Sequence, residues 1–324
     1  KTEVSFGASY GIRNVTKMVD VLNPYEFALW QHEIQPTSYT YGTYEDLEIY
    51  KSKKGNDYQE ELFGRTGNQQ NYNVSISGGN KDLKYSVSYA RNDEKSIMLG
   101  SGFTKDNLNA KINSTINKWL SFDFNARFSY QTIDGLAGGA DANQSNKAYS
   151  AVARSAIFRP VPAISGSGDD DDENVVSYYT PVEQTNATYK KQSRFQQNYN
   201  AGLNWDPFKG LKFRSEFGYG YRYNNTDQVW DYMATSNSKL GMSGFPQAQM
   251  TRDIIKNWRI ANTVSYDTKK LMDGDMRLNI MLGQEVTSSQ NNKTTYSSVG
   301  YEVGTKIEEI LAAMGNGTPQ PTNT

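Results

Sequence analysis

Cysteine is absent from the 324-residue sequence, and histidine occurs once, at His32. The lack of cysteine excludes disulfide bonds and thiolate metal sites, and one histidine leaves few ways to build a nucleophile–base pair or a transition-metal site. We interpret His32, which lies in a segment expected to be helical, as a surface or packing residue. The sequence therefore predicts neither an enzyme nor a cofactor.

Long apolar runs are missing as well. No segment approaches the roughly 18 residues that a membrane-spanning helix requires, and only 36% of the residues are hydrophobic, with a mean hydropathy of -0.74. A soluble domain of this composition would be polar and rich in loops. A β-barrel in lipid has the same composition, because only alternate residues of its strands face the membrane.

Neither sign of charge dominates. The formal net charge is -1 and the pI is about 6.0, so the sequence gives no electrostatic reason to expect a nucleic acid partner. Clustered carboxylates can bind Ca²⁺, but the spacing of an EF-hand is missing here. The sequence has one acidic run, Asp169–Glu173, which we interpret as part of a solvated loop. A weak alternative is a calcium site formed by Asp169, Asp170, Asp171 and Asp172.

Alternation of apolar and polar residues is the main signal that is present. In residues 120–131, apolar side chains such as Phe122 and Phe128 alternate with polar ones such as Asp123 and Arg127. Because successive side chains of a β-strand point to opposite faces, this segment has one apolar and one polar face. The pattern predicts nine strands, over residues 4–13, 71–77, 83–89, 107–113, 120–131, 198–205, 211–222, 258–266 and 276–282.

The connections between these strands alternate in length. Short turns are expected at residues 78–82, 117–118, 206–210 and 268–275, and long excursions at 15–66, 134–191 and 224–253. Short turns at one end and long loops at the other are typical of outer-membrane barrels. Two loop helices are expected, one over 23–33, with Asn23 as N-cap and Pro24 in the first turn, and one over 145–160.

Large aromatic residues next to the short turns, such as Trp119, Trp205 and Tyr266, match the aromatic girdle of a membrane barrel, although each one alone fits a hairpin core equally well. We therefore predict an all-β fold, a transmembrane antiparallel β-barrel with long extracellular loops that carry short helices. No linker divides the chain, so residues 1–324 are expected to form part of one barrel domain.

Two groups of residues are candidates for function in such a barrel. Charged residues on the polar strand faces are expected to line the lumen, and the four singled out are Arg127, Lys212, Arg214 and Glu216. Aromatic residues of the long loops are candidates for stacking on a substrate, and these are Tyr178, Tyr179, Trp230 and Tyr232. The alternatives are a hydrated lining with internal ion pairs for the first group, and loop packing or docking of a partner for the second.

The amino-acid sequences of several segments are similar to those of one protein family. RTGNQQNYNVSISGGNKDLKYSVSYA (Arg65–Ala90) closely resembles the second and third barrel strands of SusC/RagA proteins, which are TonB-linked outer-membrane transporters. NPYEFALW (Asn23–Trp30) resembles the start of the first long loop in this family, and residues 102–131 resemble its next hairpin. The resemblance extends over about residues 1–221, and after that it rests more on the pattern of alternation than on the residues themselves.

The resemblance implies a barrel of about 22 strands with a plug domain inside it. The nine expected strands would be the first part of that barrel, without the plug and the later strands. It further implies import of a bulky nutrient, an oligosaccharide or an oligopeptide, across the bacterial outer membrane. Energy would come through TonB acting on the plug, and a SusD-like surface lipoprotein would cap the mouth. The lumen charges would then contact the plug.

Three other functions remain open at this point. The first is a passive porin or another non-transporting outer-membrane barrel. The second is a secreted all-β adhesin or carbohydrate-binding module, which would need another sheet to cover its apolar faces. The third and weakest is a soluble β-rich hydrolase, because no paired acids stand out from the loops.

Overall fold

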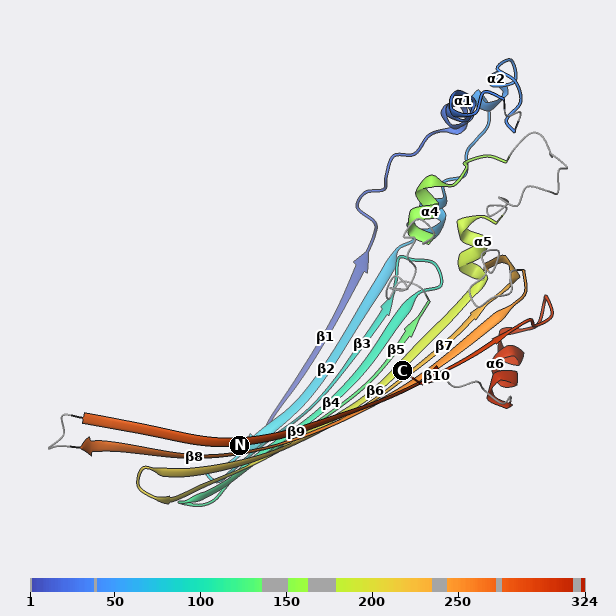
Figure 1. Ribbon diagram of the computed structural model, residues 1–324. Helices are drawn as coiled ribbons and strands as arrows, with labels where there is room; N and C mark the ends of the chain where they lie inside the picture. Colours follow the sequence, from blue (N-terminus) through green and yellow to red (C-terminus); the bar gives the residue numbers. More distant parts are fainter. Residues whose placement is uncertain are drawn as a thin grey trace.

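A single curved antiparallel sheet dominates the computed structural model, which describes residues 2–37, 40–135, 151–162, 179–234, 244–271, 276–316 and 322–323 (Figure 1). Ten strands follow one another in chain order, each hydrogen-bonded to the next, with β1 and β10 at the edges. The prediction of nine strands is confirmed by the nine long ones, and β10 adds a two-residue pairing to β9. The strands are β1 (Glu3–Arg13), β2 (Gly67–Gly79), β3 (Leu83–Lys95), β4 (Gly102–Asn117), β5 (Leu120–Asp134), β6 (Thr188–Phe208), β7 (Leu211–Trp230), β8 (Gln247–Leu271), β9 (Met276–Val299) and β10 (Thr322–Asn323).

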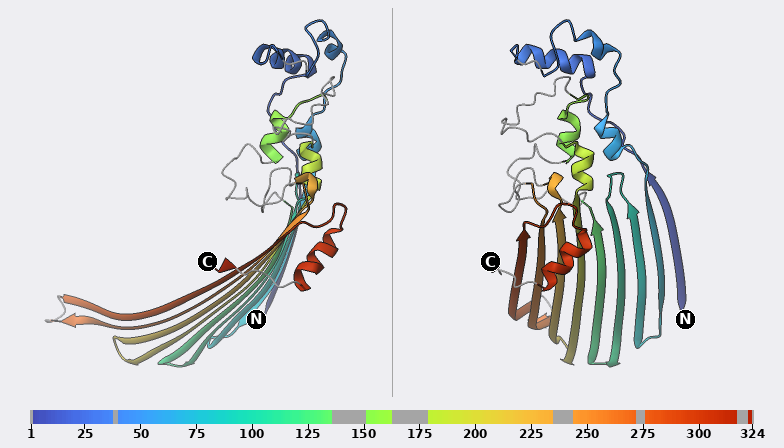
Figure 2. Two further views of the ribbon diagram at one scale, coloured as in Figure 1. Left: turned by 45° about the vertical axis from the view of Figure 1, so that its right-hand side comes forward. Right: turned by 90° about the vertical axis from the view of Figure 1, so that its right-hand side faces the viewer.

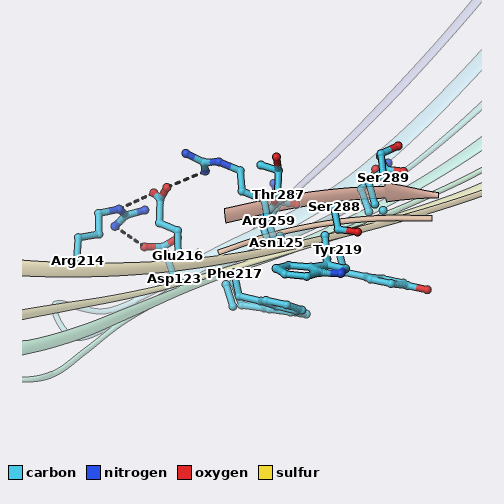
Figure 3. A pocket seen from close by; sticks show the side chains of 18 of the residues that line it. Asp123, Asn125, Arg214, Glu216, Phe217, Tyr219, Arg259, Thr287, Ser288 and Ser289 are labelled. Carbon is cyan, nitrogen blue, oxygen red and sulfur yellow. Dashed lines mark hydrogen bonds and ion pairs between the residues drawn. The ribbon is translucent and has the colours of Figure 1, made fainter. Parts of the chain in front are cut away.

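The two faces of the sheet differ as the alternation predicts. Register pairs apolar residues with apolar residues across neighbouring strands, for example Phe124 with Ala201 and Ala201 with Phe217. The sheet is curved, with a convex and a concave side (Figure 2). The apolar side chains Phe217 and Tyr219 point to the convex side (Figure 3). Large side chains of this face are open to the surroundings, with Phe208 at 73% exposure. The polar face lines the concave side. An exposed apolar face of this extent is unusual for a soluble protein and typical of a lipid-facing surface.

Short turns lie at one end of the sheet and long, helix-bearing connections at the other (Figure 2). The first long connection carries α1 (Pro24–Ile34), α2 (Glu48–Lys51) and α3 (Tyr58–Phe63), and the second carries α4 (Ala151–Ile157) and α5 (Pro181–Asn186). The 3₁₀ turn η2 (Tyr232–Ala234) follows β7, and α6 (Ile307–Asn316) follows β9. None of the helices in the described ranges is long and apolar enough to cross a membrane.

The helix predicted over residues 23–33 is confirmed. Asn23 is its N-cap: the Asn23 side chain accepts from the Glu26 amide at 2.9 Å, and the Glu26 carboxylate accepts from the Asn23 amide at 3.0 Å. This capping box satisfies two of the amides that a helix start leaves without partners. Of the helix predicted over 145–160, α4 occupies 151–157, and residues 145–150 lie outside the described part of the chain.

The third long connection, predicted over residues 224–253, is shorter in the structure. Strand β7 continues to Trp230 and β8 begins at Gln247, so residues 224–230 and 247–253 pair with each other instead of forming a loop. These residues are mostly polar and do not alternate strictly. Backbone hydrogen bonds hold the ladder whatever the polarity of the side chains, so the pairing continues where the alternation ends.

The long connections pack against one another. Ala28 of α1 packs with Tyr50 and with Val161 of the second connection, and the Asn56 amide donates to the Pro160 carbonyl at 2.9 Å. A second cluster lies where α6 meets the convex face, with Ile310 buried against Val229 of β7 and Ala248 of β8.

Candidate functional site

The strand register places charged residues side by side on the polar face. Because antiparallel partners share a face, one row across β5 to β9 contains Asp123, Gly202, Glu216, Ala261 and Glu285. Arg214 of β7 and Arg259 of β8 lie on the same face, each two residues before the row member of its own strand. Because the two strands are antiparallel, the two arginines lie on opposite sides of the row. Residues more than 150 positions apart in the sequence thus meet within one patch of the concave wall.

Two arginines link three carboxylates into a continuous network, and Figure 3 shows four of the five residues, Asp123, Arg214, Glu216 and Arg259. Arg214 donates to Asp123 at 3.0 Å and to Glu216 at 2.6 Å. Arg259 donates to the second oxygen of Glu216 at 3.2 Å and to Glu285 at 2.9 Å. We call these five residues the charge network. Each arginine is shared by two acids, so the charges of the network largely neutralise one another.

Small residues make room for this network. A Cβ atom at Gly202 would lie 2.7 Å from both carboxylate oxygens of Asp123 and 2.9 Å from Arg214 Nη2, closer than any side chain allows. Gly218 and Gly220 of β7 are the floor of a hollow of about 660 Å³, with Asn200 and Asn257 beside them. The glycines thus provide space on the polar face, where another polypeptide or a solute can approach the backbone.

Of the four predicted lumen residues, all lie on the polar face, and the structure brings two of them together. Arg214 and Glu216 belong to the charge network. Arg127 lies two positions along β5 from Asn125, in a hollow that extends toward β3. Lys212 lies apart, in a hollow at the turn between β6 and β7.

Glu285 is the member of the site that sequence reasoning missed. The ninth apolar face was taken to end at Leu282, although β9 continues to Val299. Position 285 has the same parity as the polar positions of that strand. Extending the alternation beyond Leu282 would have found it, but its pairing with Arg259 depends on the register and leaves no trace in the sequence.

The predicted loop aromatics divide into three cases. Tyr179 and Tyr232 come from different connections and meet edge to face, with ring centroids 5.9 Å apart, and Arg154 donates to the Tyr179 carbonyl at 3.1 Å. Trp230 was predicted to lie in a loop, but it is the last residue of β7 and only 8% exposed, because the strand continues further than the alternation. Tyr178 and Asp169–Glu173 lie outside the described residues.

The first long connection contains buried polar side chains. His32 is 5% exposed and stacks on Tyr44, with ring centroids 5.0 Å apart, so it is a packing residue. Tyr50 is 1% exposed, and its hydroxyl has no hydrogen-bond partner among the residues that the structure describes. Burial, with smaller contributions from Tyr41 and Asp46, raises the pKa of Tyr50 to about 12. Hydrogen bonds from the amide and hydroxyl of Thr43 lower the pKa of Asp46.

Two curated proteins that are similar in sequence to this chain are both TonB-dependent receptors. The chain is 22% identical over 229 residues to TonB-dependent receptor P3 of Formosa agariphila. This match covers 68% of the chain and 21% of that receptor. It is 28% identical over 145 residues to TonB-dependent receptor SusC of Bacteroides thetaiotaomicron, covering 42% of this chain and 13% of SusC. No family model matches the sequence.

Solved structures agree on the fold. The RagAB peptide importer in its closed-closed state matches all of this chain with a TM-score of 0.71 at 17% identity, and the match covers 38% of that chain. Its open-open state matches with a TM-score of 0.70 at 18% identity. The resemblance to SusC/RagA-like transporters is confirmed. The SusC/RagA-like chain spans about a fifth or less of the length of the curated relatives, so it corresponds to a part of such a protein.

Proposed function

We propose that this SusC/RagA-like chain forms part of the wall of an outer-membrane β-barrel that imports a bulky nutrient in a TonB-dependent manner. The observation that carries the proposal is the division of the sheet into an exposed apolar convex face and a polar concave face. Lipid would cover the first, and the second would line the transport path. Residues 1–324 would belong to one barrel domain, located in the bacterial outer membrane.

In this proposal, a plug domain and a surface lipoprotein would complete the transporter. A plug domain would fill the concave side and connect to TonB, and Arg127, Lys212, Arg214 and Glu216 would face it. A SusD-like lipoprotein would close the extracellular mouth above the packed connections. The cargo would be an oligopeptide or an oligosaccharide, and RagAB, a peptide importer, has the same fold.

We place the cargo contact in the connections at the helix-bearing end. Tyr179 and Tyr232 present a pair of rings there, and aromatic faces stack on sugar rings and on peptide side chains alike. Replacement of both by alanine is expected to reduce uptake while the barrel still assembles. Tyr44→Ala, which removes an exposed ring in the first connection, is the matched control.

The deciding experiment is purification of the native protein from outer membranes in mild detergent, followed by mass spectrometry of what accompanies it. The proposal expects a SusD-like lipoprotein in equal amount, and a glycan or peptide whose uptake stops when TonB is deleted. A barrel without plug sequence and with uptake independent of TonB would instead be a passive porin. Extraction by high salt without detergent would contradict any membrane location and favour a secreted module.

A further inference from the structure

Two cations of the polar face lie outside the charge network. Lys111 of β4 pairs in register with Asn125, and Arg127 of β5 pairs with Asn109, so the two cations are diagonal neighbours on adjacent strands. Across the ranges that the structure describes, neither side chain takes part in an ion pair or a hydrogen bond with another residue. Two like charges this close repel each other unless an anion lies between them.

The hollow that the two cations share contains donors and no acid. The acid nearest to it in register, Asp123, is diagonal to Lys111 on β5 and is paired with Arg214. A hollow of about 360 Å³ is lined by six side chains from β3, β4 and β5: Ser86, Ser88, Asn109, Lys111, Asn125 and Arg127. An ammonium and a guanidinium only donate hydrogen bonds, and hydroxyl and amide groups can donate as well. A carboxylate only accepts, with four lone-pair positions on two oxygens, and so complements this set of groups.

The contrast with the charge network is informative. Arg214 and Arg259, on the strands to one side, each have two carboxylate partners on the same sheet. The fold therefore has the means to neutralise arginines on this face within the chain, and at Lys111 and Arg127 it does not. The partner of these two cations is expected to come from outside the sheet.

The shape of the site indicates what kind of partner this is. The hollow lies on the face of a sheet and its walls are short side chains, so a free small molecule would remain largely in water, whereas small-molecule sites bury most of their ligand. A protein surface that fills the concave side would cover the site itself. Complementary charges across a wet, polar surface are typical of such contacts.

We propose that Lys111 and Arg127 bind the carboxylate of an aspartate or glutamate from a polypeptide domain seated in the concave side of the sheet. This rests on the proposed function, in which the concave side is the barrel interior. The contact would hold that domain against β4 and β5, at a place distinct from the charge network over β5 to β9.

Carbodiimide cross-linking of the full-length protein, purified in detergent, tests the contact. The reagent activates a carboxylate, which forms an amide bond with a nearby lysine amine, while the carbodiimide takes up the lost water as a urea. Mass spectrometry should find Lys111 joined to an acidic residue outside residues 1–324 of the same polypeptide. Arg127→Lys places a second amine at the site and should add a cross-link to the same acid, and Lys111→Ala should lose the first.

Lys84 is the internal control, because it lies on the same face in a hollow that contains Asp82 and Asp123 and should cross-link within the chain. The proposal is overturned if Lys84 reacts and Lys111 does not, if Lys111 joins only to acids within residues 1–324, or if it joins to a co-purified peptide. The proposed function fails separately, through uptake that does not depend on TonB, which would leave the cross-link unchanged.

Discussion

Arg214 of β7 reaches across strand β6 to Asp123 of β5, and its Nη1 lies 3.0 Å from the Asp123 Oδ1. Gly202 of β6 pairs in register with Asp123 on one side and with Glu216, two residues from Arg214, on the other. The ion pair passes over Gly202, where a Cβ would come within 2.7 Å of the carboxylate. A contact between next-nearest strands therefore depends on the absence of a side chain on the strand between them.

Gly202→Ala is expected to break this ion pair and lower the stability of the folded sheet by about 1 kcal/mol, since both side chains are about one-third exposed and such pairs contribute modestly. The shift of electrophoretic mobility on heating, which reports barrel unfolding, would measure it. Gly283→Ala is the control, because a Cβ there meets its nearest neighbour at an ordinary 3.5 Å. Equal effects of the two variants would contradict the steric argument.

Arg259→Gln is expected to destabilise the folded sheet slightly, because Glu216 and Glu285 then lose a shared cation. The difference from the unchanged protein should shrink in about 1 M salt, where exposed charges are screened within about 3 Å. The double variant with Glu285→Gln should recover part of the loss, because it removes the carboxylate left without a partner. A loss that salt and the second substitution do not change would mean that Arg259 acts through packing.

Tyr50→Phe is expected to leave the first connection as stable or slightly more stable, because the substitution removes a buried hydroxyl without a partner and keeps the ring. The same residue predicts a response to pH. Its folded-state pKa of about 12 exceeds the ordinary value of 10.0, so its contribution to stability is complete below pH 10 and is lost as the pH rises toward 12.

Limited proteolysis within residues 14–66, at a series of alkaline pH values, would measure this loss. The phenylalanine variant should show a weaker increase in cleavage through that window, and Tyr44→Phe, at an exposed position, should behave like the unchanged protein. Identical profiles for all three proteins would show that another group controls the alkaline response.

Asn23→Ala should remove the capping box of α1 and cost about 1 kcal/mol. Hydrogen exchange of the α1 amides should then accelerate about fivefold if local opening controls it. Glu33→Ala, at an exposed position near the end of the same helix, is the control and should leave exchange unchanged. No change in the Asn23 variant would show that packing by Ala28 alone holds the helix.

The sequence predicted the sheet because alternation is a local signal. Each residue of β5 or β7 shows its face through its own polarity, and Asn23 and Pro24 mark the start of α1 without knowledge of the fold. The short helix α5 was missed although Thr180 and Glu183 form a capping box that the sequence contains.

The charge network needed more than local information. That Arg214 meets Asp123, and Arg259 meets Glu285, follows from the register of five strands, and a shift by one residue would move each side chain to the other face. Trp230 was misplaced for a related reason, since β7 keeps its backbone pairing beyond the point where its alternation ends.

The position of helix α6 indicates how deeply the strands would be immersed in a bilayer. Its buried residues Ile310 and Met314 cover Val229 and Ala248, which lie on the same face as the open aromatic residues nearer the short turns. Lipid tails would shield such apolar side chains at no cost, and water would not, so a protein cover is needed only above the acyl chains. In a bilayer, the hydrocarbon of the outer leaflet would thus end below α6. The upper parts of β7, β8 and β9, with α6 packed on them, would extend into the lipid head groups and the medium beyond.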